Sequence, residues 1–309
     1  MRALSQISDG VQHPGVLAAN SVFERFESVK DVSVNWIAKG RRHGFLEARY
    51  VRRTAEKLVV YVSVATGCKQ ACRMCHLTAT GQTRLENAST DDIVRQARQV
   101  LEWYDATSSG AEVVHFDFMA RGEPLDNPNV LADGHELLSR LSGEARSRGL
   151  FPKFLISTIV PRSFRAYAFC DVFPVIHPEI YYSIYSMDES FRKRWLPKAV
   201  PAEDGLSLLK GWQDRTAKIP KLHFPLIGGA NDSPENAIAI CRAVRAAGLR
   251  VNVNLIRYNP YSQAHGYEPS YDVYEQNAAT FREHLPDANV KIITRVGFDV
   301  NVACGMFVK

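Results

Sequence analysis

The stretch TGCKQACRMCHLTATGQT, residues 66–83, places three of the six cysteines within eight residues, at Cys68, Cys72 and Cys75. The spacing C-x3-C-x2-C directly follows an apolar run that predicts a strand. Three thiolates on one tight loop can bind three irons of a four-iron, four-sulfur cluster and leave the fourth iron open to another ligand. A zinc site that uses His76 is an alternative, although the adjacent residues 75 and 76 make poor tetrahedral ligands. A group of thiols without any metal is the third possibility.

The composition indicates an ordinary globular protein. Its 309 residues are 46% hydrophobic and 23% charged, which suffices for one large core or two smaller ones. No apolar run approaches the ~20 residues of a membrane helix, and the first residues lack the apolar core of a secretory signal. Clustered cysteines in so long a chain do not suggest a secreted disulfide framework. We therefore predict a cytoplasmic protein with reduced thiols.

Short apolar runs alternate with amphipathic segments along most of the chain. Residues 1–35 are predicted to form a small helical extension, and two alternating segments around RRHG (41–44) predict a hairpin. The predicted strands are 58–64, 112–118, 153–158, 180–186, 221–227, 250–256 and 290–294. The predicted helices are 89–106, capped by Ser89 or Thr90, 128–142, 162–170, segments up to about 215, 233–247 and 271–285.

This alternation indicates parallel βαβ units. Six or seven such units favour a full or partial barrel, with ligands at the carboxyl ends of the strands. We predict an α/β fold with a partial (β/α)6-type barrel in residues 57–309, preceded by a short extension and a basic hairpin in residues 1–56. The segment 38–53 carries six Lys and Arg residues against Glu47 alone. It is either a phosphate-binding surface or a solvated hairpin face.

Six further segments narrow the interpretation, and they follow one another in a fixed order: MARGEPLDNPNV (119–130), residues 155–161 with LIST and VP, SIYSMDESFRKRWLP (183–197), GGANDSPENA (228–237), NLIRYNPY (254–261) and TRVGFDVNVACGMF (294–307). Together with the cysteine motif they resemble the radical S-adenosylmethionine (SAM) superfamily, and within it the RlmN/Cfr family, which methylates adenine of 23S ribosomal RNA at carbon 2 or 8. The resemblance runs from about Asn35 to the C-terminus. It implies a radical SAM barrel with a [4Fe-4S] cluster and SAM as cofactors.

The resemblance also assigns roles to residues. Cys68, Cys72 and Cys75 would hold the cluster, Cys304 in VACGM would carry a methyl group, and Glu47 in EARY would accept a proton. Without the resemblance, Cys304 would be a buried structural thiol and Glu47 a surface charge of the hairpin. The SAM site would be lined by Gly122, Glu123, Ser157, Ser183, Ile184, Tyr185 and Asn259. Tyr185 stands where the family commonly has histidine, and Met74 where the superfamily usually has an aromatic residue.

One position departs from the family pattern in a way that matters for chemistry. The family has a second essential cysteine seven residues before the first cluster cysteine, and this chain has Tyr61 there. A phenol cannot form the disulfide that releases the methylated product in the family. Cys170 and Cys241 lie in apolar helical patterns, where packing is the usual role of cysteine.

The leading prediction is a radical SAM methyltransferase that methylates an sp2 carbon of adenine in RNA, in 23S ribosomal RNA and also transfer RNA. Its partners would be RNA and an electron donor such as flavodoxin or ferredoxin, with no membrane, and the enzyme would be a monomer. One alternative is a radical SAM enzyme that acts on a peptide or another small acceptor. Another is a non-catalytic iron–sulfur protein that binds nucleic acid, against which the GEP and NPY segments argue.

Overall fold

The computed structural model describes residues 15–308, and ten strands in this part form one sheet in chain order. The first four strands are antiparallel neighbours: β1 (Glu24–Glu27), β2 (Val34–Lys39), β3 (Phe45–Arg52) and β4 (Lys57–Tyr61). From β4 onward all neighbours are parallel: β5 (Val113–Phe118), β6 (Phe151–Thr158), β7 (Glu179–Tyr182), β8 (Lys221–Pro225), β9 (Asn252–Ile256) and β10 (Val290–Ile293). The predicted hairpin and parallel series are thus confirmed.

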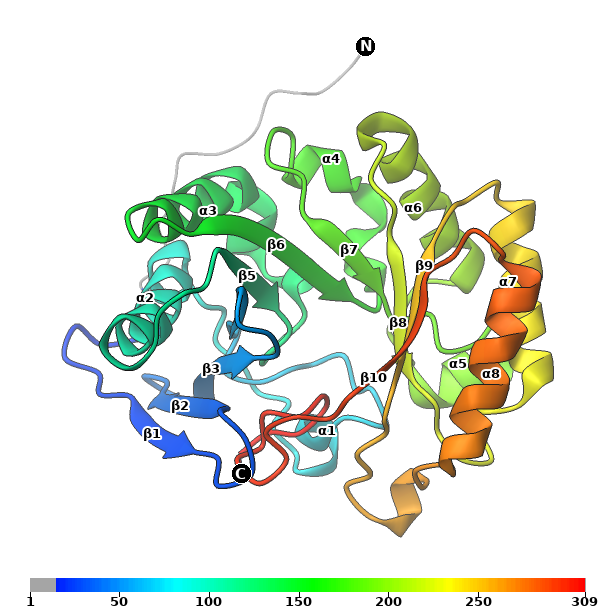
Figure 1. Ribbon diagram of the computed structural model, residues 1–309, viewed down its shortest axis with the longest axis horizontal. Coiled ribbons are helices and arrows are strands. Elements are labelled where there is room, and N and C mark those ends of the chain that lie inside the picture. Colours follow the sequence, from blue (N-terminus) through cyan, green and yellow to red (C-terminus); the bar gives the residue numbers. More distant parts are fainter. Residues whose placement is uncertain (1–14, 309) are drawn as a thin grey trace.

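Helices cover the outer side of the curved sheet (Figure 1). They are α2 (Thr90–Thr107), α3 (Pro128–Arg146), α4 (Phe169–Val172), α5 (Glu189–Trp195), α6 (Ala202–Thr216), α7 (Pro234–Ala246) and α8 (Tyr271–His284), while the short α1 (His76–Ala79) follows the cysteine motif. Parallel neighbours require such crossover connections, because after each strand the chain must return to the end of the sheet where that strand began. The strands at the two ends of the sheet order, β1 and β10, are not paired with each other, so the predicted α/β partial barrel is confirmed.

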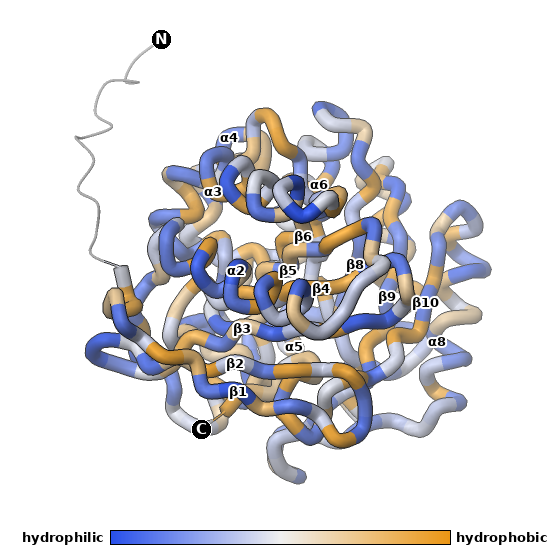
Figure 2. Tube along the Cα trace, turned by 60° about the vertical axis from the view of Figure 1, so that its left-hand side comes forward, coloured by the Kyte–Doolittle hydropathy of each residue, from blue (hydrophilic) through white to orange (hydrophobic). Residues whose placement is uncertain are grey.

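Local sequence explains where the helices begin and which side they bury. Ser89 caps α2 as predicted, with its Oγ accepting from the Asp92 amide at 3.2 Å while the Asp92 carboxylate accepts from the Ser89 amide at 2.9 Å. Asp92 also accepts from the amides of Val16 and Leu17, at 2.7 and 3.0 Å, so the described N-terminal segment is fastened to this helix. Apolar and polar residues alternate along the helical tubes (Figure 2), as expected for helices with one buried face.

The structure corrects two of the predicted elements. The predicted helical extension is wrong over residues 15–35, which contain β1 and turns, while residues 1–14 lie outside the described part of the chain. Pairing with β2 at the sheet edge explains this extended conformation, since β1 gains backbone partners there. The predicted helix 162–170 is instead a 3-10 turn, η2 (Arg162–Ala166), followed by the short α4.

Three predicted strands, 58–64, 180–186 and 221–227, end two to four residues too late at their carboxyl ends. Beyond the end of β4, the amides of Val62 and Val64 donate to the carbonyls of Asp117 and Arg121 at 3.0 and 2.8 Å. The chain therefore stays beside the neighbouring connection after the regular strand ends, and it begins to form the loops of the site.

Phe116 of β5 faces the helices and supplies a direct test of the core. It is completely buried, and its ring stacks on Phe154 with 5.6 Å between centroids. Phe116→Ala should lower the free energy of unfolding by about 3–5 kcal/mol, because it removes buried surface and leaves a cavity. Urea denaturation at 25 °C measures this change. Phe151→Ala is the matched control, since Phe151 is 60% exposed, and equal losses in both variants would contradict the described core.

Candidate active site

The cysteine loop, residues 66–75, is held in shape by a neighbouring segment. The amides of Thr66 and Cys68 donate to the carbonyls of Glu86 and Gln82 at 3.0 and 3.1 Å. Gly67 allows this approach, because a Cβ there would lie 2.4 Å from the carbonyl oxygen of Arg84. The Cys75 amide donates to the Cys72 carbonyl at 3.1 Å, and Cys75 is the N-cap of α1. The loop therefore turns back on itself and brings its three thiols to one place.

That place is a pocket of about 140 Å³, the cysteine pocket, which also receives side chains from the ends of β6 and β7 and from the loop after β5. It collects seven of the residues that the sequence singled out, Cys68, Cys72, Cys75, Gly122, Glu123, Ser157 and Ser183, and Gln70, Thr78, Phe118, Met119, Thr158 and Ile159 complete the lining. Carboxyl ends of neighbouring parallel strands meet at one end of a barrel. Residues that are up to 115 positions apart thus share one pocket.

Gly122 and Glu123 form the wall opposite the thiols. Gly122 has φ +93°, and a Cβ there would lie 2.7 Å from Cγ2 of Val64, so only glycine fits without strain. The Glu123 carboxylate is buried and accepts from the amides of Leu125 and Ile159 at 3.1 and 3.2 Å. Burial raises the pKa of Glu123 to about 7. No salt bridge to Glu123 occurs within the described residues, so this carboxylate can receive a cationic group from a ligand.

The thiols of the cysteine loop share one electrostatic feature. Burial raises the pKa of Cys68 to about 12, with a further contribution from Cys75, and it raises the pKa of Cys72 well above its ordinary range. Thiolates this close together repel one another, so a cation is needed to hold all three ionised. Within residues 15–308, no group of three His, Cys, Asp or Glu side chains could hold a single metal ion. A cluster does not need that convergence, because each thiolate binds a different iron.

A larger space, the barrel cavity of about 700 Å³, adjoins the cysteine pocket at Met119, which lines both. Cys304 and Tyr61 line this cavity together. The Cys304 side chain is exposed to this cavity. Partial desolvation by the surrounding protein, and next the nearby Cys75, raises its pKa to about 11. Cys304 is thus an accessible neutral thiol at neutral pH, and Tyr61 shares its cavity at the position where the sequence departs from the family.

Asn259 links the cysteine loop to the loop of Cys304. Its Nδ2 donates to the Cys304 carbonyl at 2.9 Å, and its own carbonyl lies 3.1 Å from Nε2 of His76. The His76 amide in turn donates to the Gly305 carbonyl at 3.1 Å. The Oδ1 of Asn259 is buried, lines the barrel cavity side of this link and has no hydrogen-bond partner in the described part of the chain. An unpaired buried acceptor of this kind calls for a donor from a ligand.

Two predicted SAM-site residues, Ile184 and Tyr185, line neither the cysteine pocket nor the barrel cavity in the described structure. Both are buried behind Ser183. Tyr185 has φ +59°, and its carbonyl accepts from Nδ2 of Asn231 and of Asn236 at 3.1 and 3.0 Å. These residues fix the turn after β7 and so set the position of Ser183.

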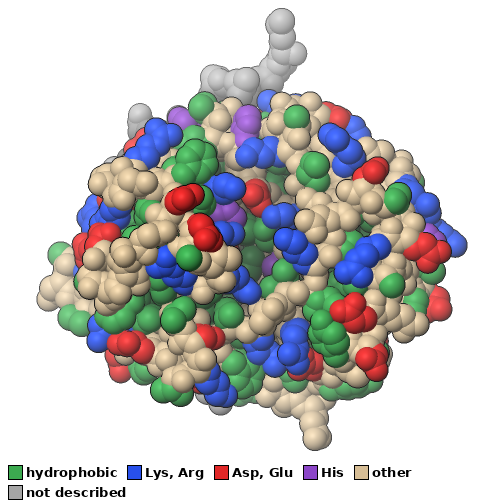
Figure 3. Space-filling model, viewed as in Figure 1, with side chains coloured by type: hydrophobic (Ala, Val, Ile, Leu, Met, Phe, Trp, Pro, Cys, Tyr) green, Lys and Arg blue, Asp and Glu red, His purple; other side chains and the backbone are tan. Residues whose placement is uncertain are grey.

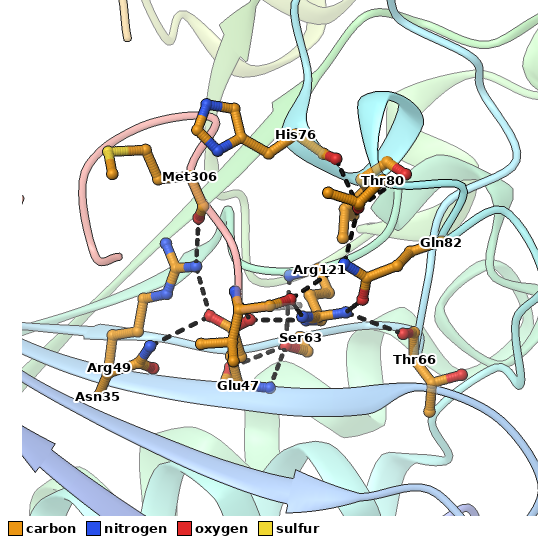
Figure 4. Close-up of polar contacts among 12 residues, drawn as sticks. Asn35, Glu47, Arg49, Ser63, Thr66, His76, Thr80, Gln82, Arg121 and Met306 are labelled. Atoms are coloured by element: carbon orange, nitrogen blue, oxygen red, sulfur yellow. Dashed lines mark hydrogen bonds and ion pairs between the residues drawn. The ribbon is translucent and has the colours of Figure 1, made fainter. Parts of the chain in front are cut away.

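Glu47 lies in a buried ion-pair network and not on the hairpin surface (Figure 4). Its Oε2 accepts from Nη2 of Arg49 at 2.6 Å and from Nδ2 of Asn35 at 3.2 Å. Its Oε1 accepts from Nε of Arg121 at 2.7 Å and from the Val308 amide at 3.0 Å. Burial alone raises the pKa of Glu47, but the charges and hydrogen bonds of the two arginines lower it, and the net pKa lies below the ordinary range.

The two arginines carry this network to the C-terminal segment 302–308. Arg49 donates from Nη1 to the Val302 carbonyl at 3.1 Å and from Nη2 to the Met306 carbonyl at 2.8 Å. Arg121 donates from Nη2 to the Val308 carbonyl at 2.5 Å. The segment that presents Cys304 therefore rests on these three side chains. Sequence reasoning did not select Arg49 or Arg121 as site residues, although both stand inside the quoted EARY and MARGEP segments.

Cys170, Cys241 and part of the basic segment lie away from the two cavities, whereas Arg49 and Arg53 of that segment line the barrel cavity. Cys170 and Cys241 are buried in the hydrophobic core, on α4 and α7, as their apolar patterns predicted. In the basic segment, Lys39, Arg41 and Arg42 are exposed. Within residues 15–308, none of the helices has the length and apolar character of a membrane span.

Sequence comparisons relate this chain to RNA methyltransferases. No family model matches the chain. It is 30% identical over 260 residues to a "Probable dual-specificity RNA methyltransferase RlmN" from Synechococcus sp. (strain CC9902), which covers 82% of this chain and 69% of that protein. A protein of the same name from Akkermansia muciniphila is 27% identical over 263 residues, covering 81% of this chain and 66% of that protein.

A crystal structure of a radical SAM methyltransferase from Sphaerobacter thermophilus superimposes with a TM-score of 0.77, at 19% identity, over 93% of this chain and 80% of that one. The [FeFe]-hydrogenase maturase HydG superimposes with a TM-score of 0.54, at 12% identity, over 77% of this chain and 52% of that one. Both likenesses show that the barrel described above is a shared fold.

The Glu47 network can be tested through stability. Glu47→Gln should lower the free energy of unfolding at pH 7 by about 3–5 kcal/mol, because it leaves two buried arginines without their counter-charge. The native pKa is depressed, so the contribution of Glu47 is complete above the ordinary value of 4.5 and is lost as the pH falls below it. The difference between wild type and variant should therefore shrink on acidification.

Urea denaturation at pH 7 and at several lower pH values measures this difference. Glu102→Gln is the matched control, since Glu102 is an exposed carboxylate on α2, and its stability should follow wild type at every pH. A Glu47→Gln variant as stable as the control at pH 7 would show that the network is not paired in solution.

Proposed function

This chain belongs to the RlmN family of radical SAM methyltransferases, and we propose that it transfers a methyl-derived carbon to an sp2 carbon of adenine in RNA. The observation that carries the proposal is the position of Cys304. Its accessible thiol lines the barrel cavity, and its loop accepts a hydrogen bond at the Gly305 carbonyl from the amide of His76, the residue that follows the cysteine loop. The name of the relatives, a dual-specificity RNA methyltransferase, supports RNA as the acceptor, in 23S ribosomal RNA and transfer RNA.

The residues of the cysteine pocket fit the two cofactors that this reaction uses. Cys68, Cys72 and Cys75 would bind a [4Fe-4S] cluster, since the three side chains line one pocket. The buried Glu123 carboxylate would receive the ammonium group of SAM. When both are bound, cluster and SAM supply the 5′-deoxyadenosyl radical.

Polar atoms around the pocket would complete SAM binding. Gly122 lets the backbone approach closely, and Ser157 and Ser183 line the pocket. Asn259 would use its unpaired Oδ1 as an acceptor. Ile184 and Tyr185 would act through the turn that positions Ser183.

Cys304 would carry the methyl group as a thioether between SAM and the acceptor ring. The release of the product is where this chain differs from its family pattern, because Tyr61 lines the cavity in place of a second thiol. Neither Cys170 nor Cys241 lines the cavity. We therefore expect product release without a disulfide between Cys304 and either of these residues.

Glu47 is the proposed proton acceptor of the reaction. Four donors, from Asn35, Arg49, Arg121 and Val308, already occupy its two oxygens, so accepting a proton requires one of them to give up its hydrogen bond first. The contacts support a positioning role as well, since Glu47 orients both arginines toward the segment of Cys304. Loss of methyl transfer in Glu47→Gln with Cys304 still methylated by SAM would separate the two roles in favour of proton transfer.

The exposed cations Lys39, Arg41 and Arg42 of the hairpin would contact RNA phosphates, and binding should weaken steeply with salt. An electron donor such as flavodoxin or ferredoxin would reduce the cluster. We place the enzyme in the cytoplasm, where its six free cysteines would stay reduced, and propose that it acts as a monomer.

The first test is peptide mass spectrometry after anaerobic cluster reconstitution and incubation with SAM alone. The peptide that contains Cys304 should gain the mass of one methylene group, which is one methyl in place of one hydrogen. Cys304→Ala should abolish this gain, whereas Cys241→Ala, with its thiol in the core, should retain it. Addition of unmodified 23S ribosomal RNA together with reduced flavodoxin as the electron donor should then yield methyladenosine in the RNA digest.

Two outcomes would contradict the proposal at different steps. SAM cleavage with an unmodified Cys304 would indicate a radical enzyme of another reaction class. A methylated Cys304 with no methyladenosine in ribosomal or transfer RNA would keep the methyl carrier and reject RNA as the acceptor.

A further inference from the structure

The interior of the barrel is polar along positions where a filled barrel carries branched aliphatic layers. The side chains that line the barrel cavity from β4, β5, β7, β8 and β9 include Lys57, His115, Asp117, Tyr181, Lys221, His223, Asn252 and Asn254. Lys57, Lys221 and Asn252 are the first residues of their strands, so the cavity reaches the amino-terminal ends. We call this part of the cavity the polar chamber. Figure 3, which views the molecule as in Figure 1, shows a hollow near the centre with Lys and Arg side chains around it.

Burying these polar groups costs free energy, and the hydrophobic core lies on the opposite face of the same strands. His115, Asp117, His223 and Asn254 are each at most 9% exposed, while residues on the opposite face of the same strands, such as Phe116, form the hydrophobic core. The Oδ1 atom of Asp117 has no hydrogen-bond partner in the described part of the chain. A buried polar atom without a partner costs about 1–3 kcal/mol. Polar residues around a cavity of about 700 Å³ are therefore better explained by a ligand.

The charge of the polar chamber favours an anion. Lys221 is paired with Glu179 at 2.7 Å, but Lys57 has no ion pair within residues 15–308. Of the seven Lys and Arg residues that line the barrel cavity, Arg49, Lys221, Arg257 and Arg295 are ion-paired with Glu47, Glu179 and Glu268. Arg53, Lys57 and Lys291 have no ion pair within residues 15–308, and Asp117 is the one carboxylate residue among the described lining residues. Burial, and next the charge of Lys57, lowers the pKa of His115 to about 3. Burial, and next the charge of Lys221, lowers the pKa of His223 to about 3 as well. The barrel cavity thus holds three unpaired cations against one carboxylate, so its potential is positive.

The aromatic and imidazole rings that line the barrel cavity favour a planar ligand. Tyr61, Tyr181, His115 and His223 all line the cavity, and the rings of Tyr181 and His223 lie 5.0 Å apart between centroids. Aromatic side chains of this kind bind planar rings by stacking or edge contacts. The Oδ1 of Asp117 lies 3.9 Å from Nδ1 of His115 and has no hydrogen-bond partner in the described part of the chain. It can accept from a ring N–H or amino group, and the amide of Asn254 can donate or accept.

We propose that the polar chamber binds a small molecule that has a planar aromatic ring and an anionic group, either a phosphate monoester or a carboxylate. The anion would lie near Lys57 and the ring near Tyr181 and His223. The chamber is separate from the cysteine pocket, because none of its eight residues lines that pocket. The inference goes beyond the proposed methyl transfer and does not depend on it.

Calorimetric titration of the cluster-reconstituted enzyme, saturated with SAM, tests the site directly. Adenosine 5′-monophosphate probes the phosphate form, indole-3-carboxylate the carboxylate form, and adenosine the ring without charge. At least one anionic probe should bind, with adenosine about tenfold weaker or more, which corresponds to about 1.4 kcal/mol. Binding by one anion and not the other identifies which anionic group the chamber takes.

Lys57→Met should weaken the anionic probe about tenfold, since it removes one unpaired positive charge and keeps the length of the side chain. Lys193→Met is the matched control, because Lys193 lies on α5 with 76% of its side chain exposed, and it should bind like wild type. Asn254→Ala should also weaken binding, and thermal melts of all variants show whether each remains folded.

Three results would overturn the inference. The anionic probes could fail to bind the SAM-saturated enzyme at millimolar concentration. They could bind Lys57→Met and wild type equally. They could bind only without SAM, which would assign them to the cysteine pocket. Failure of methyl transfer to Cys304 alters none of these readouts, so the two proposals fail independently.

Discussion

One buried carboxylate shared by two arginines joins the hairpin, the loop after β5 and the C-terminal segment. Glu47 is on β3, Arg121 is in the loop after β5, and their common partner is the C-terminal segment 302–308. Charges taken out of water are costly unless each one is paired and its hydrogen bonds are complete. Both oxygens of Glu47 meet this condition. The arrangement leaves little freedom in where Cys304 lies relative to the cysteine loop, and the chemistry proposed for that thiol depends on this fixed position.

Much of the fold could be predicted because its cause is local. Ser89 caps its helix through atoms three residues away, and the repeated apolar strands have periods that a short window shows. The cysteine pocket was also within reach, since carboxyl ends of parallel strands meet at one end of a barrel. Gly122, Glu123, Ser157 and Ser183 accordingly arrive beside the three thiols. Their assigned roles came from the resemblance to a family, and the geometry shows only that they share a pocket.

What could not be predicted depends on contacts between distant parts of the chain. EARYVRR alternates like a solvated hairpin, yet Glu47 and Arg49 are buried because the C-terminal segment covers that face of the hairpin. The N-terminal segment Glu24–Glu27 has no apolar period of its own, and it forms the strand β1 by pairing with β2 at the sheet edge. The polar chamber was missed for a related reason. Lys57, His115 and Asn254 look like ordinary polar positions in their separate strands, and only the curvature of the sheet turns them toward one space.

The C-terminal contacts also impose an order on folding. The carbonyl partners of Arg49 lie 253 and 257 positions further along the chain, and the amide that Val308 donates to Glu47 comes from 261 positions away. Contacts with such separations form late, because the entropy of closing the intervening loop must be overcome first. While a ribosome is still making the barrel, the carboxylate and guanidinium groups of the hairpin remain hydrated. They can be desolvated as a complete set only after residues 302–308 have been synthesised. Cys304, which lies in this segment, therefore reaches its final position late in folding.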